Sequence, residues 1–162
     1  MKLFEKILVP TDFSSHAALA VQTAADLSRR YDASLTLIYV LEPMASFLPA
    51  GYPMFIGPQL DPLFAELEKL LAEAKRAAEG AGAVRVTTNL LHGFAPGEIC
   101  ELATSAAHDL IVMGTHGRAG LAHWLLGSVA ERVVRMAPCP VLTLRAEGRA
   151  ASTPGGDTAS TA

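Results

Sequence analysis

Short, continuous apolar runs alternate along the chain with longer segments in which apolar residues recur every three or four positions. Residues 6–9, 34–41 and 110–113 form such runs, which are typical of strands buried on both faces of a parallel sheet. Residues 84–91 and 140–144 predict two further strands, of which the first alternates less cleanly. The pattern therefore predicts five strands.

The longer segments predict four helices. Ser14 or Ser15 can cap the first helix, and Asp61 followed by proline is a typical start for the second. Glycine and proline residues mark several of the other boundaries. The predicted helices, in order, span 14–31, 61–80, the segment from the turn at 93–96 to 108–109, and 128–136.

Five strands that alternate with four helices predict an α/β fold. Each crossover between parallel strands is right-handed and carries a helix, so we expect an open five-stranded parallel sheet with helices on both faces. Two segments interrupt the alternation. The proline-rich and apolar segment 42–61 is either a lid or partner surface, or an irregular flap packed on its own domain. The tail 146–162 has few large residues and is expected to be disordered, which leaves one domain at 1–145.

Composition narrows the class of protein further. The 162 residues are 51% hydrophobic, but no window holds the roughly 18 uninterrupted apolar residues of a membrane span. The amino terminus lacks the apolar core of a signal peptide, so we expect a cytoplasmic location and no membrane partner. A net charge of −3, without a basic cluster, argues against nucleic acid as a partner.

Cysteine and histidine spacing gives no sign of a metal centre. Cys100 and Cys139 lie far apart and outside any C-x-x-C pattern, so we expect neither a disulfide framework nor zinc. His116 and His123 are seven residues apart, with no carboxylate or cysteine in register, and are not expected to bind a metal.

Polar and glycine-rich residues follow two of the predicted strands. In open α/β sheets, ligands bind beyond the carboxyl ends of the strands, where the strand order reverses. Pro10, Thr11 and Asp12 follow the first strand, and a glycine-punctuated segment from Gly114 to Gly120 follows the fourth. Glycines allow a backbone to approach a phosphate closely, and the unpaired amides at a helix amino terminus attract anions. The pattern therefore predicts an anion as ligand.

Each of these residues also has a purely structural interpretation. Asp12 could cap the first helix, since aspartate is a preferred capping residue. Ser128 and Glu131 match a capping box, S-x-x-E, which would explain both without a ligand. Gly114 and Gly117 could serve ordinary turns.

The full spacing is more specific than its parts. The segment Gly114-x2-Gly117-x9-Gly127-Ser128 resembles the glycine pattern of nucleotide-binding members of the universal stress protein family. The Val-Pro-Thr-Asp that ends the first strand, the Ile-Val-Met-Gly of the fourth and the later Cys-Pro-Val-Leu also resemble that family, over Phe4 to about Arg145.

The resemblance implies a Rossmann-like sheet of order 3-2-1-4-5, of the adenine nucleotide alpha hydrolase-like type. It also implies ATP or a related adenine nucleotide as ligand, with Mg or Mn as the accompanying ion, and a homodimer formed through the last strand. Val141, Leu142 and Leu144 would form that edge. Arg118, the one cation of the glycine segment, would contact phosphate. The resemblance implies a binding site made of Pro10, Thr11, Asp12, Val40, Met113, Gly114, Thr115, His116, Gly117, Arg118, Ala119, Gly120, Gly127, Ser128, Val129 and Ala130.

The leading functional hypothesis is a cytoplasmic, ATP-binding stress or regulatory protein whose occupancy alters its shape or its partner binding. The chain has no Walker A lysine and no H-x-G-H signature, so we expect no dedicated catalytic residue. Two alternatives remain open at this point. One is a dimeric interaction module that does not depend on nucleotide, and the other is a slow ATP hydrolase.

Overall fold

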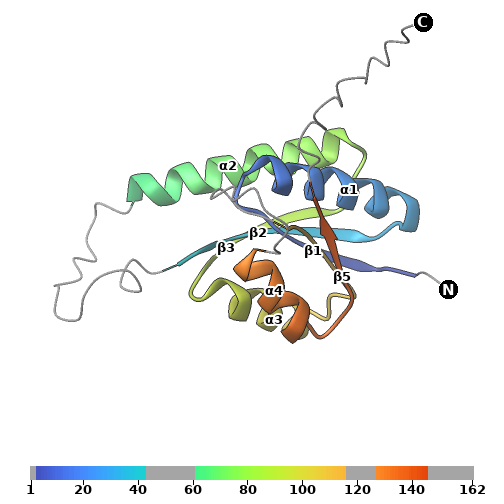
Figure 1. The fold of residues 1–162 in the computed structure, drawn as a ribbon. Helices are drawn as coiled ribbons and strands as arrows, with labels where there is room; N and C mark the ends of the chain where they lie inside the picture. Colours follow the sequence, from blue (N-terminus) through green and yellow to red (C-terminus); the bar gives the residue numbers. More distant parts are fainter. Residues whose placement is uncertain (1–2, 43–60, 116–126, 146–162) are drawn as a thin grey trace, which may run out of the picture.

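A computed structural model describes residues 3–42, 61–115 and 127–145. These residues form one parallel sheet of order β3-β2-β1-β4-β5, with two helices on each face (Figure 1). The strands are β1 (Lys6–Pro10), β2 (Ser34–Leu41), β3 (Val86–His92), β4 (Leu110–Gly114) and β5 (Val141–Leu144). The helices are α1 (Ser15–Tyr31), α2 (Asp61–Gly80), α3 (Ala95–Ser105) and α4 (Ser128–Met136).

The predicted fold class and strand order are confirmed. Helices α1 and α2 cover one face of the sheet, and α3 and α4 cover the other (Figure 1). Successive side chains of β1 point alternately to the two faces of the sheet. Ile7 and Val9 belong to the core under α1 and α2, and Leu8 belongs to the core under α3 and α4. All three side chains have no exposed surface.

Alanine brings α1 close to the sheet. Ala20, Ala24 and Ala25 are fully buried on the face of α1 that meets β1 and β2. Because alanine adds little side-chain volume, the helix axis can approach the strands closely. The alanine content that raises the mean hydropathy of this chain is therefore used, in α1, for packing between layers.

Several predicted boundaries move by a few residues. The third strand begins at Val86 and not at residue 84, because Arg85 adopts a left-handed backbone with φ of 52°. Helix α3 ends at Ser105, before the predicted end at 108–109. Ala107 has φ of 53°, and His108 donates its backbone N–H to the Ala103 carbonyl at 2.9 Å, which closes the helix. Most of segment 42–61 and the tail 146–162 lie outside the described residues.

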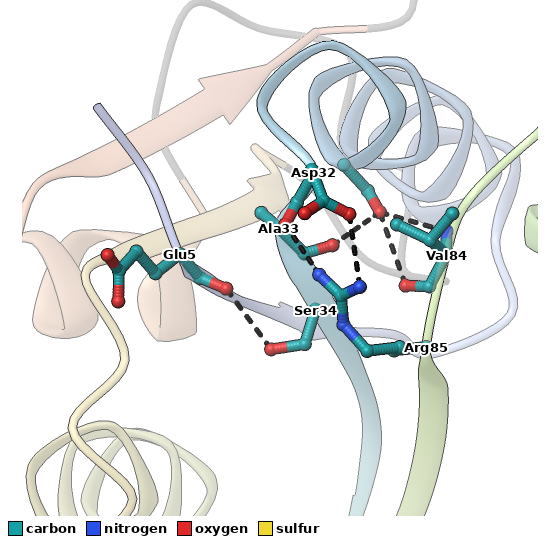
Figure 2. Close-up of polar contacts among 7 residues, drawn as sticks. Glu5, Asp32, Ala33, Ser34, Val84 and Arg85 are labelled. Atoms are coloured by element: carbon teal, nitrogen blue, oxygen red, sulfur yellow. Dashed lines mark hydrogen bonds and ion pairs between the residues drawn. The ribbon is translucent and has the colours of Figure 1, made fainter. Parts of the chain in front are cut away.

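A buried serine joins three segments at the amino-terminal edge of the sheet, and its partners Ala33 and Val84 are labelled in Figure 2. The Ser28 hydroxyl, which has no exposed surface, donates to the Ala33 carbonyl at 2.7 Å and accepts from the Val84 amide at 3.2 Å. Beside it, Arg85 forms an ion pair with Asp32 at 3.0 Å. These contacts connect the turn after α1 to the entry of β3.

Within residues 3–42, 61–115 and 127–145, no helix combines the length and the apolarity needed to cross a bilayer. Cys100 is buried and Cys139 half-buried, and both are free thiols. Burial raises the pKa of each thiol, which keeps them protonated and weakly reactive.

His108 is a buried histidine that connects α3 to β2. Its Nδ1 lies 3.3 Å from the Leu102 carbonyl and its Nε2 lies 3.1 Å from the Thr36 hydroxyl. Because a carbonyl can only accept, Nδ1 must carry the proton, and a neutral ring then accepts from Thr36 through Nε2. Burial lowers the pKa of His108, and Lys6 lowers it further, while the Leu102 carbonyl and Asp109 act in the opposite direction.

The lowered pKa predicts a stability that falls in mild acid. In the unfolded chain His108 has a pKa of about 6.5, so between that value and the folded pKa the unfolded state binds the extra proton. The free energy of unfolding should therefore be fully retained above about pH 6.5 and decline below it. We expect His108→Gln to reduce this slope in denaturant titrations over a pH series. An unchanged slope in the variant would contradict the assignment.

Candidate functional site

The candidate site lies where the strand order reverses. From β1 the chain builds outward through β2 to β3, then crosses back to add β4 and β5 on the other side. The carboxyl ends of β1 and β4 are therefore neighbours whose following loops diverge, which is the usual ligand position in such sheets. Pro10, Thr11 and Asp12 lie at the end of β1, and Met113, Gly114 and Thr115 at the end of β4.

Hydrogen bonds hold the turn after β1 in place. The Thr11 amide donates to the Ile38 carbonyl at 2.8 Å, and the Thr11 hydroxyl accepts from the Phe13 amide at 3.0 Å. Asp12 Oδ1 accepts from both the amide and the hydroxyl of Ser14, at 3.1 and 2.6 Å. Phe13 has a left-handed backbone, with φ of 63°. The turn thus points the chain sharply from the strand into α1.

Ser14, and not Asp12, caps helix α1. The Ser14 hydroxyl oxygen accepts from the Ala17 amide at 3.2 Å, as the serine pattern predicted. Asp12 instead orients the Ser14 side chain. The structural interpretation of Asp12 as the helix cap is therefore wrong. Its carboxylate accepts a hydrogen bond from the Ser14 hydroxyl, and Ser14 forms the cap.

Gly114 is required by packing. A Cβ built on Gly114 would lie 3.0 Å from both the carbonyl carbon and the Cβ of His16, in the first turn of α1. Few real Cβ atoms come so close to a backbone. One glycine of the motif therefore has a reason within the fold, whatever else it contacts.

The ends of the glycine segment meet in space. The Thr115 amide donates to the Leu144 carbonyl of β5 at 2.8 Å, and the Gly127 amide donates to the Thr115 carbonyl at 2.7 Å. Residues 115 and 127 thus close the base of a loop. His116, Gly117, Arg118, Ala119 and Gly120, which the sequence assigned to the site, lie outside the described residues.

The expected capping box at α4 is absent. Gly127 occupies the capping position without a side-chain hydrogen bond, and Ser128 is already the first helical residue. Glu131 pairs with Arg135 at 3.0 Å instead of reaching back. The prediction was wrong because the helix starts one residue earlier than an S-x-x-E box with Ser128 as its cap requires. The first-turn amides of Ser128, Val129 and Ala130 have no intrahelical acceptors, and no side chain of residues 3–42, 61–115 and 127–145 caps them.

Val40 lies at the same edge of the sheet, one strand away. Pro10 pairs with Ile38 in the parallel register of β1 and β2, so Val40 extends two residues beyond that pair. Its side chain is half-buried and packs in the core under α3 and α4. On the opposite face, Phe13 stacks on Tyr39 with ring centroids 5.1 Å apart. The structure thus brings together the described members of the predicted set.

Sequence reasoning missed two contributors to this edge. Glu42, directly after β2, accepts a hydrogen bond from the Ala95 amide at 3.1 Å and so supports the start of α3. Phe94 lies beside Arg132 of α4, with the guanidinium carbon 5.2 Å from the ring centroid. Neither pair carries a local sequence signal. Among the described residues, His, Cys, Asp and Glu side chains form no group of three or more that could hold a metal ion.

The fold and this edge define a class of doubly wound α/β proteins with a ligand position at the switch point. The sequence profile described as the universal stress protein family matches residues 3–145. Universal stress protein MJ0531 of Methanocaldococcus jannaschii is 40% identical over 145 residues, covering 88% of this chain and 83% of the relative. The chain belongs to the universal stress protein family.

Solved structures agree with this assignment. The hypothetical protein MJ0577 superposes with a TM-score of 0.78 at 28% identity, over 90% of this chain and 99% of that one. A universal stress protein in complex with cAMP superposes with a TM-score of 0.66 at 27% identity, over 88% and 97%.

The contact with His16 predicts that Gly114→Ala destabilises the fold. The added methyl must displace the backbone of α1 or β4, and overpacking of this kind costs about 1–3 kcal/mol. Denaturant titration would measure the loss. Gly80→Ala is the matched control, because a Cβ there meets nothing within 4 Å. Equal stability of the two variants would show that α1 and β4 are not in tight contact.

Proposed function

We propose that this protein binds an adenine nucleotide at the carboxyl ends of β1 and β4, and that occupancy modulates its conformation or its binding of a partner. One observation carries the proposal. The switch point brings the turn of Thr11 and Asp12 beside Thr115 and Gly127. There, among the described residues, no side chain caps the first amides of α4. The relative solved with cAMP supports this class of ligand.

The proposed roles follow from position. The Val40 backbone would meet the adenine edge, while Pro10, Thr11 and Asp12 would lie beside the nucleoside. The end of β4 and the glycine segment would surround the ribose and phosphates. The exposed Ser128 hydroxyl and the first amides of α4 would bind the outer phosphates, which favours ATP over a nucleotide with fewer phosphates.

A magnesium or manganese ion would fit this edge only in company with the nucleotide. Asp12 supplies one carboxylate, and Mg²⁺ in nucleotide sites is commonly bound by one or two carboxylates together with phosphate oxygens and water. We therefore propose that Asp12 faces a metal-bound water or the ribose. The phosphate oxygens of the nucleotide would supply the other ligands of the ion.

The nucleotide proposal predicts thermal stabilisation by MgATP. Ligand at about 100 times its dissociation constant should add about 2.7 kcal/mol to the free energy of unfolding. Mass spectrometry of the native protein should also identify an adenine nucleotide that copurifies. Absence of both effects would overturn the proposal.

Ser128→Glu separates binding from folding. A carboxylate in the first turn of α4 is favourable to the helix dipole, so the stability without ligand should hold, while repulsion of phosphate should abolish the MgATP effect. Gln22→Glu, which adds the same charge at an exposed position of α1, is the control and should retain the full effect. An equal response in both variants would place the phosphates elsewhere.

A second candidate function is a dimeric interaction module that does not need nucleotide. It is favoured by the tight contact of Gly114 with His16, since this glycine has a use without any ligand. β5 is an edge strand, and Val141, Leu142 and Leu144 offer an apolar edge to a second copy. Both candidate functions include a homodimer through β5.

The homodimer predicts a twofold mass in light scattering at micromolar concentration. Leu142→Lys should weaken association at least about tenfold, because burial of a leucine stabilises by roughly 1.5–3 kcal/mol and lysine adds charge repulsion. Leu63→Lys, at an exposed leucine of α2, is the matched control. A monomeric wild-type protein would contradict the proposal.

A further inference from the structure

Part of the parallel sheet is polar where apolar residues are the norm. Parallel strands are usually covered on both faces. On the face that meets α3, the amino-terminal halves of β2 and β3 instead carry Ser34, Thr36, Thr87 and Asn89, and the Cα register pairs Thr36 with Thr87. A pocket of about 280 Å³ lies over this region. Its lining includes Lys6, Ser34, Thr36, Thr87, Asn89 and His108.

The hydroxyl hydrogens of this pocket point into the protein. Ser34 donates to the Glu5 carbonyl at 3.1 Å, as Figure 2 shows. Thr36 donates to the neutral ring of His108, and Thr87 donates to the Thr36 oxygen at 3.3 Å or the Leu35 carbonyl at 3.5 Å. The three hydroxyls therefore offer only oxygen lone pairs to a molecule in the pocket.

The charged groups of the pocket are cationic. Its lining, within the part of the chain that the structure describes, includes no carboxylate. The Lys6 ammonium donates one hydrogen bond, of 3.0 Å, to the Ala106 carbonyl, which leaves two N–H groups. Among the described residues, Lys6 has no carboxylate within ion-pair distance. Asp109 is held by the backbone amides of Glu5 and Lys6, and Asp32 is paired with Arg85. Lys6 and the exposed Asn89 thus supply donors.

We propose that this pocket binds a small oxyanion that carries hydroxyl groups, such as a phosphorylated or carboxylated polyol. Lys6 and Asn89 would donate to the oxyanion, and the Ser34 and Thr87 oxygens would accept from its hydroxyls. The pocket volume lies just below the range of about 300–1,000 Å³ that is usual for small-molecule sites, so the ligand is smaller than a nucleotide. The amino-terminal edge of the sheet is also opposite to the edge proposed for nucleotide, so the two sites are separate.

The proposal is tested by titrating the full chain, followed by backbone amide NMR. Glycerol 3-phosphate and glycerate are the two oxyanion probes, and they distinguish a phosphate from a carboxylate. Glycerol and inorganic phosphate each carry only half of the required chemistry. We expect saturable shifts at residues 34, 36, 87, 89 and 108 with one oxyanion probe, and weaker binding of both half-probes. Unsaturated shifts with every probe, or shifts confined to residues 10–14 and 113–115, would overturn the proposal.

Variants at the rim keep the test independent of folding. Lys6→Gln removes an exposed charge and should raise the dissociation constant about ten- to a hundred-fold, the usual effect of losing a hydrogen bond to a charged group. Asn89→Asp should also weaken binding, because it places a carboxylate beside the oxyanion. Lys69→Gln, on the exposed face of α2, is the matched control. Equal affinity of Lys6→Gln and Lys69→Gln would exclude this pocket.

Discussion

The burial of β1 on both faces is the constraint on which the rest of the structure depends. Ile7, Leu8 and Val9 have no exposed surface, and removing such side chains from water stabilises a fold by roughly 1.5–3 kcal/mol each. Their alternation requires a helical layer on each side, so α1 and α2 must lie on one face and α3 and α4 on the other. Because both faces of β1 must be covered, the helix of the third crossover, from β3 to β4, lies on the face opposite to the helices of the first two crossovers. The reversal next to the end of β1 then follows.

Much of the fold is readable from the sequence because its signals are local. Apolar runs mark the strands, Ser14 marks the start of α1, and Asp61 with the following proline marks α2. The strand order came from the resemblance to a family, since periodicity holds no information on which strands pair. Boundaries failed at Arg85 and Ala107, where residues other than glycine adopt left-handed backbones. No residue preference announces such positions.

The sequence likewise predicted one part of the candidate site and missed another. Spacing predicted which segments meet at the switch point, and the described segments do lie there. The details that failed depend on three-dimensional placement: a capping box at Ser128 needs a helix that begins one residue later than α4 does. Ser28 and His108 find their partners 56 and 72 residues away, at Val84 and Thr36, and such pairs leave no trace in a single sequence. Gly114 shows that a motif residue can also be determined by packing.

The backbone of Thr115 forms hydrogen bonds to two different elements of the fold. Its amide is bonded to the last residue of β5, and its carbonyl is bonded to the residue that precedes α4. A change in the loop that displaces residue 115 therefore pulls on the outer strand of the sheet and on the first turn of α4 together. Binding at the loop and binding at the sheet edge would therefore be energetically coupled through residue 115. Thermodynamic linkage makes the effect of each on the other equal.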